Sequence, residues 1–359
     1  MSNKKILVLG ATGVAGTAFV EHGLEAIHQG GLDWELLGVS RHAGSQFKAP
    51  SDDIAWPSDR LQYLSADLLG DHSELHKLSD ITHVVFAGFV PGGTFAEQVA
   101  PNRDLLVNCL QALENNPLER VVLIQGMKYY GSHLGQFKTP AREDDPRHEG
   151  ENYYYAQQDA LEKSGLAWTC LRPHVICGTS SVGTPQNILT VIGVYAALMK
   201  KAGRALSWPG SKLCYQAINQ ATDANLLAQA IHWALDEPRA ERQAYNITNG
   251  DFFRWEQLWP RIAGQFGMEA GEVATTNLEQ EMPAFESDWQ SLVVQHQLMD
   301  YPMNKIANWS FANYILGTDW DVMASTIKSR QHGFTPCLDT EQMYLDHLQR
   351  LQALRILPG

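Results

Sequence analysis

The sequence predicts an α/β protein in which a doubly wound parallel sheet carries a smaller, helix-rich lid. Short apolar runs alternate with segments of helical periodicity over the first half of the 359-residue chain. This alternation is typical of strands that are buried on both faces and joined by crossover helices. After Pro173 the rhythm changes, and mostly helical segments follow. We expect a sheet-bearing domain over residues 1–175, completed by parts of the second half, and a mainly helical ligand-binding region over residues 176–359.

The individual elements follow from the same periodicities. Apolar runs predict buried parallel strands at residues 6–10, 36–40, 61–65, 83–87, 121–125 and 168–172. Helical patterns are found at residues 99–112, 154–163, 187–202 and 223–236, and a further short strand is expected at residues 245–248. The polar stretch 136–151 is the longest candidate loop of the first half.

The most informative stretch is residues 4–16, which read KKILVLGATGVAG. The spacing Gly-x-x-Gly-x-x-Gly lies between an expected strand and an expected helix. Gly10 lets the chain turn, Gly13 lets the backbone approach a pyrophosphate, and Gly16 lets the helix lie close to the strand. Because a helix N-terminus favours an anion, this turn predicts a Rossmann-type dinucleotide site, with a glycine-rich turn without ligand as the alternative. The expected cofactor contacts are Gly10, Thr12, Gly13, Val14, Ala15 and Gly16.

The residues after the second expected strand indicate which cofactor binds. In NAD-selective sites an acidic residue here accepts hydrogen bonds from the ribose hydroxyls, whereas an arginine accommodates the 2′-phosphate of NADP(H). This chain has Ser40 and Arg41 and no acidic residue at that point. We therefore expect NADPH/NADP+, with a plain surface arginine as the alternative. Asp67, after the third expected strand, is placed either to contact the adenine or to cap a helix.

The bulk composition is typical of a cytoplasmic enzyme. The formal net charge of -13 argues against a nucleic-acid or anionic-membrane partner. The five cysteines are widely spaced and form no CxxC pair, so we expect reduced thiols and neither a disulfide framework nor a metal site. No stretch is apolar enough to span a bilayer, and the first apolar run is needed as a strand. The oligomeric state stays open, with a homodimer as one option.

The usual catalytic pair of short-chain dehydrogenases is missing at its usual spacing. A Tyr-x-x-x-Lys pair lies one helical turn apart, so both side chains reach the same face beside the nicotinamide. Tyr154 and Tyr155 are followed four residues on by Gln and Asp, and the one matching pair, Tyr301 and Lys305, lies beyond the nucleotide-binding half. Either the site is inactive or its lysine comes from elsewhere. Lys128, after the fifth expected strand, is the candidate.

Two motifs make the chain resemble the progesterone 5β-reductase and iridoid synthase-like (PRISE) atypical short-chain dehydrogenases, whose lysine and tyrosine come from separate motifs. The family pattern TGxKHYxGPF is similar to QGMKYYG at residues 125–131, and NFYYxxED is similar to NYYYAQQD at residues 152–159. The similarity covers essentially the whole chain. It continues through residues 165–173, 194–197, 208–211, 222–226, 249–255, 333–334 and 356–358.

The resemblance implies NADPH-dependent reduction of the activated C=C bond of an enone or enal. Hydride adds to the β-carbon while negative charge builds up on the carbonyl oxygen. By motif, Tyr154 matches the family's tyrosine, with Tyr155 as the alternative if the register slips, and Lys128 matches its lysine. The Tyr154 hydroxyl would stabilise the enolate, and Lys128 would orient or polarise it. Backbone groups near Val175 are expected to hold the nicotinamide amide, and His174 either faces the substrate or packs.

The chain departs from the family pattern at several points. Gln125 replaces Thr, Tyr129 replaces His and Gln158 replaces Glu, and the loop between Lys128 and Tyr154 is shorter than in plant members. These departures leave open whether the substrate is a steroid or a smaller enone or enal, and the stereochemistry of reduction. A sugar-nucleotide epimerase or dehydratase on the same fold and a non-catalytic NADP(H)-binding sensor are the other hypotheses. The absent Tyr-x-x-x-Lys counts against the first, and the presence of both candidate residues against the second.

Overall fold

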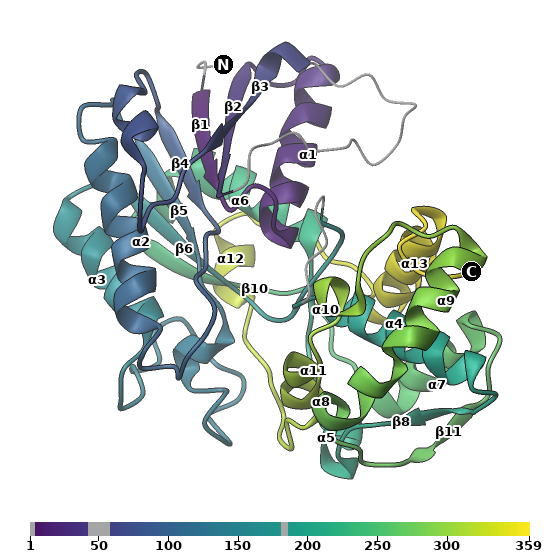
Figure 1. The fold of residues 1–359 in the computed structure, drawn as a ribbon. Coiled ribbons are helices and arrows are strands. Elements are labelled where there is room, and N and C mark those ends of the chain that lie inside the picture. Colours follow the sequence, from purple (N-terminus) through teal and green to yellow (C-terminus); the bar gives the residue numbers. More distant parts are fainter. Residues whose placement is uncertain (1–3, 42–57, 181–185) are drawn as a thin grey trace.

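The computed structural model describes residues 4–41, 58–180 and 186–359. Within these residues, seven parallel strands form one sheet in the order β10-β6-β5-β4-β1-β2-β3, with helices on both faces (Figure 1). The predicted doubly wound α/β class is therefore confirmed. The strands are β1 Lys4–Leu9, β2 Trp34–Ser40, β3 Leu61–Ser65, β4 His83–Phe86, β5 Arg120–Ile124, β6 Trp168–Pro173 and β10 Gln243–Ile247.

The two faces of the sheet have separate cores because successive side chains along a strand point to opposite sides. Ile6 and Val8 pack toward one face with α1 and α6, and Leu7 and Leu9 pack toward the other with α2. All four side chains are buried. The covering helices are α1 Val14–His28, α6 Ala224–Asp236, α2 Val99–Ala112 and α3 Tyr153–Ser164.

The elements predicted from periodicity are found with small shifts at their ends. Each of the six expected strands of the first half begins and ends within two residues of its prediction, and the expected later strand is β10 at the sheet edge beside β6. The polar stretch 136–151 contains no helix or strand, apart from an isolated bridge from Ala141 to Ala324. A strong local pattern therefore fixed the type of each element, whereas the ends depend on packing.

The second part is mainly helical and has its own core around buried tryptophans. Trp208, Trp255, Trp259 and Trp289 are almost completely buried there, and α4 is buried over nearly its whole length. Its main helices are α4 Ile188–Lys201, α7 Trp255–Gln265, α9 Glu286–His296, α11 Trp309–Leu316 and α13 Thr340–Ala353. The shorter strands and helices of the second half are β7 Ile176–Cys177, β8 Leu206–Trp208, α5 Lys212–Gln216, β9 Thr222–Asp223, η4 Pro238–Ala240, β11 Ala270–Val273, α8 Leu278–Glu281, η5 Met282–Phe285, α10 Met303–Ile306 and α12 Ile327–Gln331.

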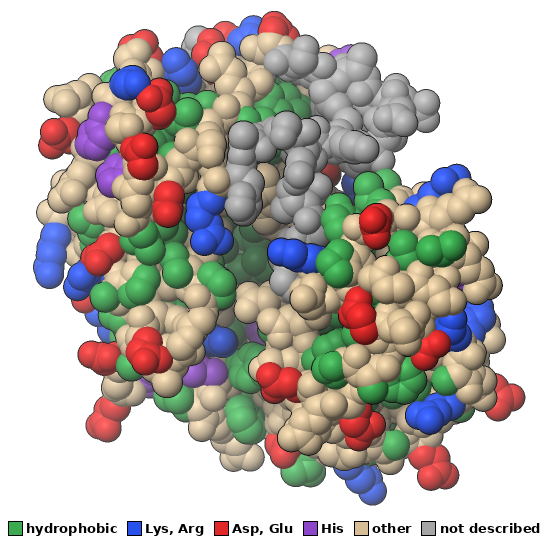
Figure 2. Space-filling view, viewed as in Figure 1, with side chains coloured by type: hydrophobic (Ala, Val, Ile, Leu, Met, Phe, Trp, Pro, Cys, Tyr) green, Lys and Arg blue, Asp and Glu red, His purple; other side chains and the backbone are tan. Residues whose placement is uncertain are grey.

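The two parts meet at the carboxyl ends of the sheet strands. In Figure 1 these ends point toward the helical part, and Figure 2 shows a hollow between the two parts with Lys and Arg side chains at its edge. Ligands of open α/β sheets bind at this end of the strands, where the strand order reverses. Here the order reverses between β1 and β4. The 3₁₀ turns η1 Ser58–Arg60, η2 Ser73–Lys77 and η3 Met127–Tyr130 complete the first half. None of the helices in the described part of the chain combines the length and apolarity needed to cross a bilayer.

Candidate active site

The glycine turn after β1 is built so tightly that two of its glycines have no room for a side chain. Gly10 has a φ of +75°, and a Cβ there would lie 2.6 Å from the carbonyl oxygen of Ala87, just after β4. A Cβ on Gly16 would lie 2.2 Å from the carbonyl oxygen of Gly10. Both approaches are shorter than any normal van der Waals contact. The turn therefore lies at the point where the strand order reverses, with α1 pressed against it.

The N-terminus of α1 is open. Gly13 precedes the helix in an extended conformation, and no side chain caps it. The backbone N–H groups of Val14, Ala15 and Gly16 donate no hydrogen bond to any residue that the structure describes. Thr12 is half-buried beside them. Free N–H groups at the positive end of a helix, without a Cβ in the way, form a cradle that fits a pyrophosphate.

The two expected contacts to the adenosine end lie at the ends of β2 and β3. The Ser40 carbonyl accepts a hydrogen bond from the Ala66 N–H, and the Arg41 carbonyl accepts one from the Ser65 hydroxyl at 3.1 Å. The Arg41 side chain is exposed and has no ion pair within the described ranges. Asp67 is also exposed and caps a turn rather than a helix, because its carboxylate accepts from the N–H two residues on.

The structure brings Lys128 and Tyr154 to one end of the sheet. Lys128 lies on η3 after β5, and Tyr154 lies in the first turn of α3. Asn152 joins the two segments: its side-chain oxygen accepts from the Tyr154 N–H at 3.0 Å, and its amide donates to the Lys128 carbonyl at 2.9 Å. The asparagine that precedes the tyrosines is therefore both the N-cap of α3 and the link between the two motifs.

The Tyr154 ring reaches across the end of β5. A Cβ on Gly126 would lie 2.9 Å from the Tyr154 hydroxyl oxygen and 3.5 Å from the carbonyl oxygen of Pro173, so the hydroxyl occupies the space left by the missing side chain. Burial raises the pKa of Tyr154, although a hydrogen bond from the Tyr153 side chain opposes this. Tyr154 thus stays a neutral phenol near pH 7 and keeps a proton to donate.

Lys128 is held by aromatic rings instead of a carboxylate. Its Nζ lies 4.8 Å from the ring centroid of Tyr314 and 5.5 Å from that of Phe95. Burial lowers its pKa, and it has no ion pair with any residue in the described ranges. His133 lies close by, and burial followed by the charge of Lys128 lowers the pKa of His133 to about 4. The ammonium is therefore the local positive charge of this site.

Tyr155, unlike Tyr154, uses its hydroxyl in hydrogen bonds to the backbone. Its hydroxyl donates to the Tyr129 carbonyl at 2.6 Å and accepts from the His148 N–H at 2.9 Å. The ring is buried and packs edge-on against that of Tyr129. Because both functions of the hydroxyl are used in backbone hydrogen bonds, the geometry favours Tyr154 over Tyr155 as the residue that faces a ligand.

A buried arginine connects the lysine turn to the tyrosine helix. The Arg172 guanidinium donates to Gln125 at 3.0 Å, to Gln158 at 3.2 Å and to the Tyr130 hydroxyl at 2.8 Å. It stacks on the Tyr129 ring, with Cζ 3.3 Å from the centroid. Two of the positions that depart from the family pattern, Gln125 and Gln158, thus meet on one guanidinium. Neither periodicity nor motif spacing gives this contact, although the paired change of two polar residues was a signal for it.

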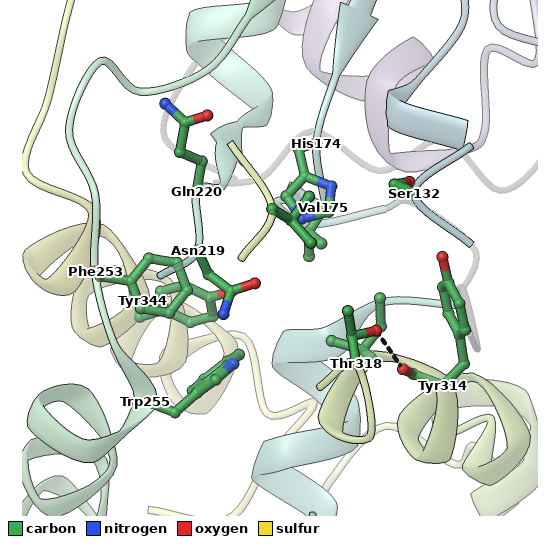
Figure 3. A pocket seen from close by; sticks show the side chains of 12 residues that line it. Ser132, His174, Val175, Asn219, Gln220, Phe253, Trp255, Tyr314, Thr318 and Tyr344 are labelled. Carbon is green, nitrogen blue, oxygen red and sulfur yellow. Dashed lines mark hydrogen bonds between the residues drawn. The ribbon is translucent and has the colours of Figure 1, made fainter. Parts of the chain in front are cut away.

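A recess lies next to the aromatic cluster around Lys128 (Figure 3). His174, Val175, Asn219 and Tyr314 are among its walls, so His174 faces the recess. Val175 has a φ of +37°, which is strained for a β-branched residue, and its carbonyl accepts from the Thr222 N–H. Tyr314 connects the recess to the candidate pair, since its ring contacts Lys128. Burial, and after it the nearby Tyr154 hydroxyl, raises the pKa of Tyr314 to about 12. Sequence reasoning missed Tyr314 and Asn219 because no local motif marks either.

Comparison of the solved structures shows the same fold in distantly related proteins. The dTDP-glucose 4,6-dehydratase DesIV of Streptomyces venezuelae, solved with NAD and TYD, aligns with a TM-score of 0.67 over 98% of both chains at 14% identity. A UDP-N-acetylglucosamine 4-epimerase of Methanobrevibacter ruminantium aligns with a TM-score of 0.65 over 98% of this chain and 99% of that one at 16% identity. At such low identity these matches establish the fold alone.

Sequence comparison identifies the family. The model of the PRISE-like Rossmann-fold domain matches residues 6–299. An (S)-8-oxocitronellyl enol synthase of Nepeta cataria and a 3-oxo-Δ(4,5)-steroid 5-β-reductase of Arabidopsis thaliana are each 31% identical over 98% of this chain and 92% of their own length. The resemblance inferred from the two motifs is thus confirmed. The chain belongs to the PRISE-like Rossmann-fold family of short-chain dehydrogenase-type oxidoreductases.

Proposed function

We propose that this enzyme uses NADPH to reduce the activated C=C bond of enones or enals. The observation that carries the proposal is the joining of Lys128 and Tyr154 through Asn152 at the carboxyl ends of the strands. A phenol and an ammonium in that position suit a reaction in which negative charge develops on a carbonyl oxygen. The names of the two relatives described above, an enol synthase and a steroid 5-β-reductase, support the same chemistry.

The choice of cofactor rests on the turn and on Arg41. The glycine cradle and the free N–H groups of Val14, Ala15 and Gly16 fit a pyrophosphate, and the exposed Arg41 side chain suits a 2′-phosphate. The backbone at Val175 lies beside the recess and is the proposed support for the carboxamide of the nicotinamide. The bound cofactor supplies the hydride. The chain's own residues then have to orient the acceptor and stabilise its charge.

Tyr154 is the proposed hydrogen-bond donor to the substrate carbonyl oxygen. Its raised pKa keeps the phenol protonated, and its hydroxyl is already in place over Gly126, so it needs no reorganisation as the enolate forms. A donor placed in this way contributes about 3–4 kcal/mol to lowering the barrier. Lys128, held between two rings, adds a positive potential at the same end of the recess. Its role is to favour the enolate electrostatically and to hold the phenol orientation.

The test is turnover of NADPH by the purified protein, followed by the absorbance of the reduced cofactor. The acceptors are 2-cyclohexen-1-one, progesterone and a series of trans-2-alkenals. We expect at least one acceptor to be reduced at the C=C bond, and Tyr154→Phe to lower kcat about 10²- to 10³-fold. Tyr301→Phe is the matched control, because Tyr301 precedes Lys305 at the spacing usual for short-chain dehydrogenases but packs in the helical part.

The outcomes separate the alternatives. Loss of activity in Tyr154→Phe with retention in Tyr301→Phe supports the proposed roles. The reverse pattern would refute the proposed site. Tight NADPH binding without turnover of any acceptor would contradict the reductase proposal and favour the sensor hypothesis.

A further inference from the structure

We infer that Asn219 forms a subsite for a hydroxyl group that the substrate carries at the end remote from its reacting carbonyl. The inference rests on the proposed function and deepens it, since it narrows the acceptor to a hydroxylated enal or enone. Asn219 lies across the recess from Tyr314, the residue that contacts the Lys128 ammonium (Figure 3). A substrate whose carbonyl meets the candidate pair would thus extend its other end toward Asn219.

The Asn219 backbone is fixed on both sides. Its N–H donates to the Phe253 carbonyl at 2.9 Å, and its own carbonyl accepts from the Phe253 N–H at 3.0 Å. This two-way bridge ties the segment before β9 to the segment that leads into α7. The side chain is therefore presented to the recess from a rigid support, as a specific binding group requires.

Asn219 is 8% exposed as a residue, and its side-chain oxygen has no hydrogen-bond donor among the residues that the structure describes. In Figure 3 the carboxamide turns toward the centre of the recess. Its nitrogen donates to the Ala217 carbonyl at 3.3 Å. Because a carbonyl only accepts, this bond defines which end of the amide is nitrogen and leaves the oxygen and one N–H facing the recess.

The other polar groups of the recess differ from Asn219. Gln220 points away in Figure 3, and its amide is used by Thr248, Asp251 and the Ala324 N–H. The Thr318 hydroxyl donates to the Tyr314 carbonyl. Gln220 and Thr318 are thus already paired within the protein.

His174 is a further polar side chain of the lining. Burial lowers its pKa to about 4, so it is neutral near pH 7, and it adjoins Val175, the proposed support for the nicotinamide. This places His174 toward the proposed cofactor end, whereas Asn219 lies beside the aromatic residues Phe253, Trp255 and Tyr344. The far end of the recess therefore combines a largely aromatic wall, which includes the Tyr344 hydroxyl, with the Asn219 amide.

A hydroxyl group matches what Asn219 presents. It donates to the amide oxygen and accepts from the remaining amide N–H, whereas a second carbonyl can only accept and an alkyl end leaves both groups unpaired. Leaving a buried acceptor unpaired is costly, and sites that are built to bind a hydroxyl discriminate against analogues that lack it. The aromatic wall suits the carbon chain that carries the hydroxyl.

The experiment compares kcat/KM for trans-2-alkenals of five to ten carbons with kcat/KM for the same aldehydes carrying a terminal hydroxyl. The chain-length series varies the distance between the aldehyde and the terminal hydroxyl, and so finds the length at which the hydroxyl reaches Asn219. At the matching length we expect the hydroxyl to raise kcat/KM about three- to tenfold, the worth of one neutral hydrogen bond. In Asn219→Leu, which is similar in size, the ratio for that pair falls to about one.

Two further variants sharpen the comparison. Asn219→Asp retains a side-chain acceptor and keeps the ratio above one, and Gln257→Leu, an exposed amide-to-leucine change on α7, leaves the ratio at the wild-type value. Because each result is a ratio of two substrates on one protein, a general loss of activity cancels. If Asn219→Leu does not fold, the wild-type length series and Asn219→Asp still test whether Asn219 binds the hydroxyl.

Three outcomes overturn the inference. The first is the absence of a hydroxyl effect at every chain length in the wild type. The second is a wild-type ratio that persists in Asn219→Leu, and the third is a ratio that is lost in His174→Leu but kept in Asn219→Leu. Each leaves the proposed function intact as long as the unsubstituted alkenals are reduced. If no alkenal or enone is reduced, the proposed function itself fails.

Discussion

Replacement of Arg172 by methionine tests whether the lysine turn and the tyrosine helix are held together by one guanidinium. Arg172 is 1% exposed, and methionine keeps most of its apolar stem. The substitution removes the donors to Gln125, Gln158 and Tyr130 and the stacking on Tyr129. All of these partners belong to the segments that carry the candidate catalytic residues.

The magnitude follows from those contacts. Each buried acceptor that loses its donor costs about 1–3 kcal/mol. Tyr130 keeps one partner because its hydroxyl donates to Asn246 at 2.7 Å, and the variant no longer has to desolvate a guanidinium. We therefore expect the free energy of unfolding to fall by about 3–5 kcal/mol, less than the sum of the single bonds.

The effect on activity should exceed the effect on cofactor binding. Gln125 donates from its amide to the Tyr154 carbonyl at 3.0 Å, so loss of its Arg172 partner loosens the start of α3. The glycine turn at Gly10 has no contact with this network in the hydrogen bonds described above. We expect kcat to fall about tenfold or more, as misplaced catalytic groups do, while the Kd for NADPH changes little.

The assay combines urea unfolding followed by tryptophan fluorescence, NADPH titration and steady-state kinetics at a temperature where the variant is folded. Arg204→Met, an exposed arginine on the helical part, is the control and should change neither stability nor kcat. Arg172→Lys keeps the charge but not the planar fork, and we expect it to recover little. A loss of stability below 1 kcal/mol, or an unchanged kcat in Arg172→Met, would refute the reasoning.

Three further predictions concern the turn, the hydroxyl and pH. Gly126→Ala places a methyl 2.9 Å from the Tyr154 hydroxyl, so kcat should fall severalfold in steady-state assays with NADPH affinity unchanged. Gly16→Ala should abolish NADPH binding and destabilise the fold by several kcal/mol, whereas Gly264→Ala, with open space around it in α7, should stabilise it by about 0.5–1 kcal/mol in urea unfolding. Burial lowers the pKa of His83 from 6.5 to about 4, so between these pH values the unfolded state binds more protons and stability falls as pH falls. His133 and His174 contribute in the same window, so His83→Gln should reduce the slope of that dependence, without removing it, in unfolding measured from pH 7 to 4.

The features that the sequence predicted well are local. The strand before Gly10 and the helix after Gly16 lie within a few residues of the turn, so apolar runs and glycine spacing specify them directly. The contact between Tyr314 and Lys128 joins residues far apart in the chain, and it depends on how α11 packs in the helical part. No periodicity encodes such a contact. Asn219 was not predicted for the same reason. In the sequence, an asparagine before a short strand is typical of a turn, and only the backbone bridge to Phe253 shows that it lines the recess from a fixed position.

Two departures from the family pattern lie in the framework of the candidate pair, whereas the residues that line the recess form a separate group. Gln125 and Gln158 replace a threonine and a glutamate, yet both bind Arg172, so their changes are coupled inside the framework that positions the candidate pair. Tyr314 and Asn219 instead line the recess, the proposed substrate site. A coupled change in the framework preserves the geometry of Lys128 and Tyr154, whereas a change in the recess alters what fits there. We therefore expect the geometry of the candidate pair to be kept, whereas the choice of substrate depends on the residues that line the recess.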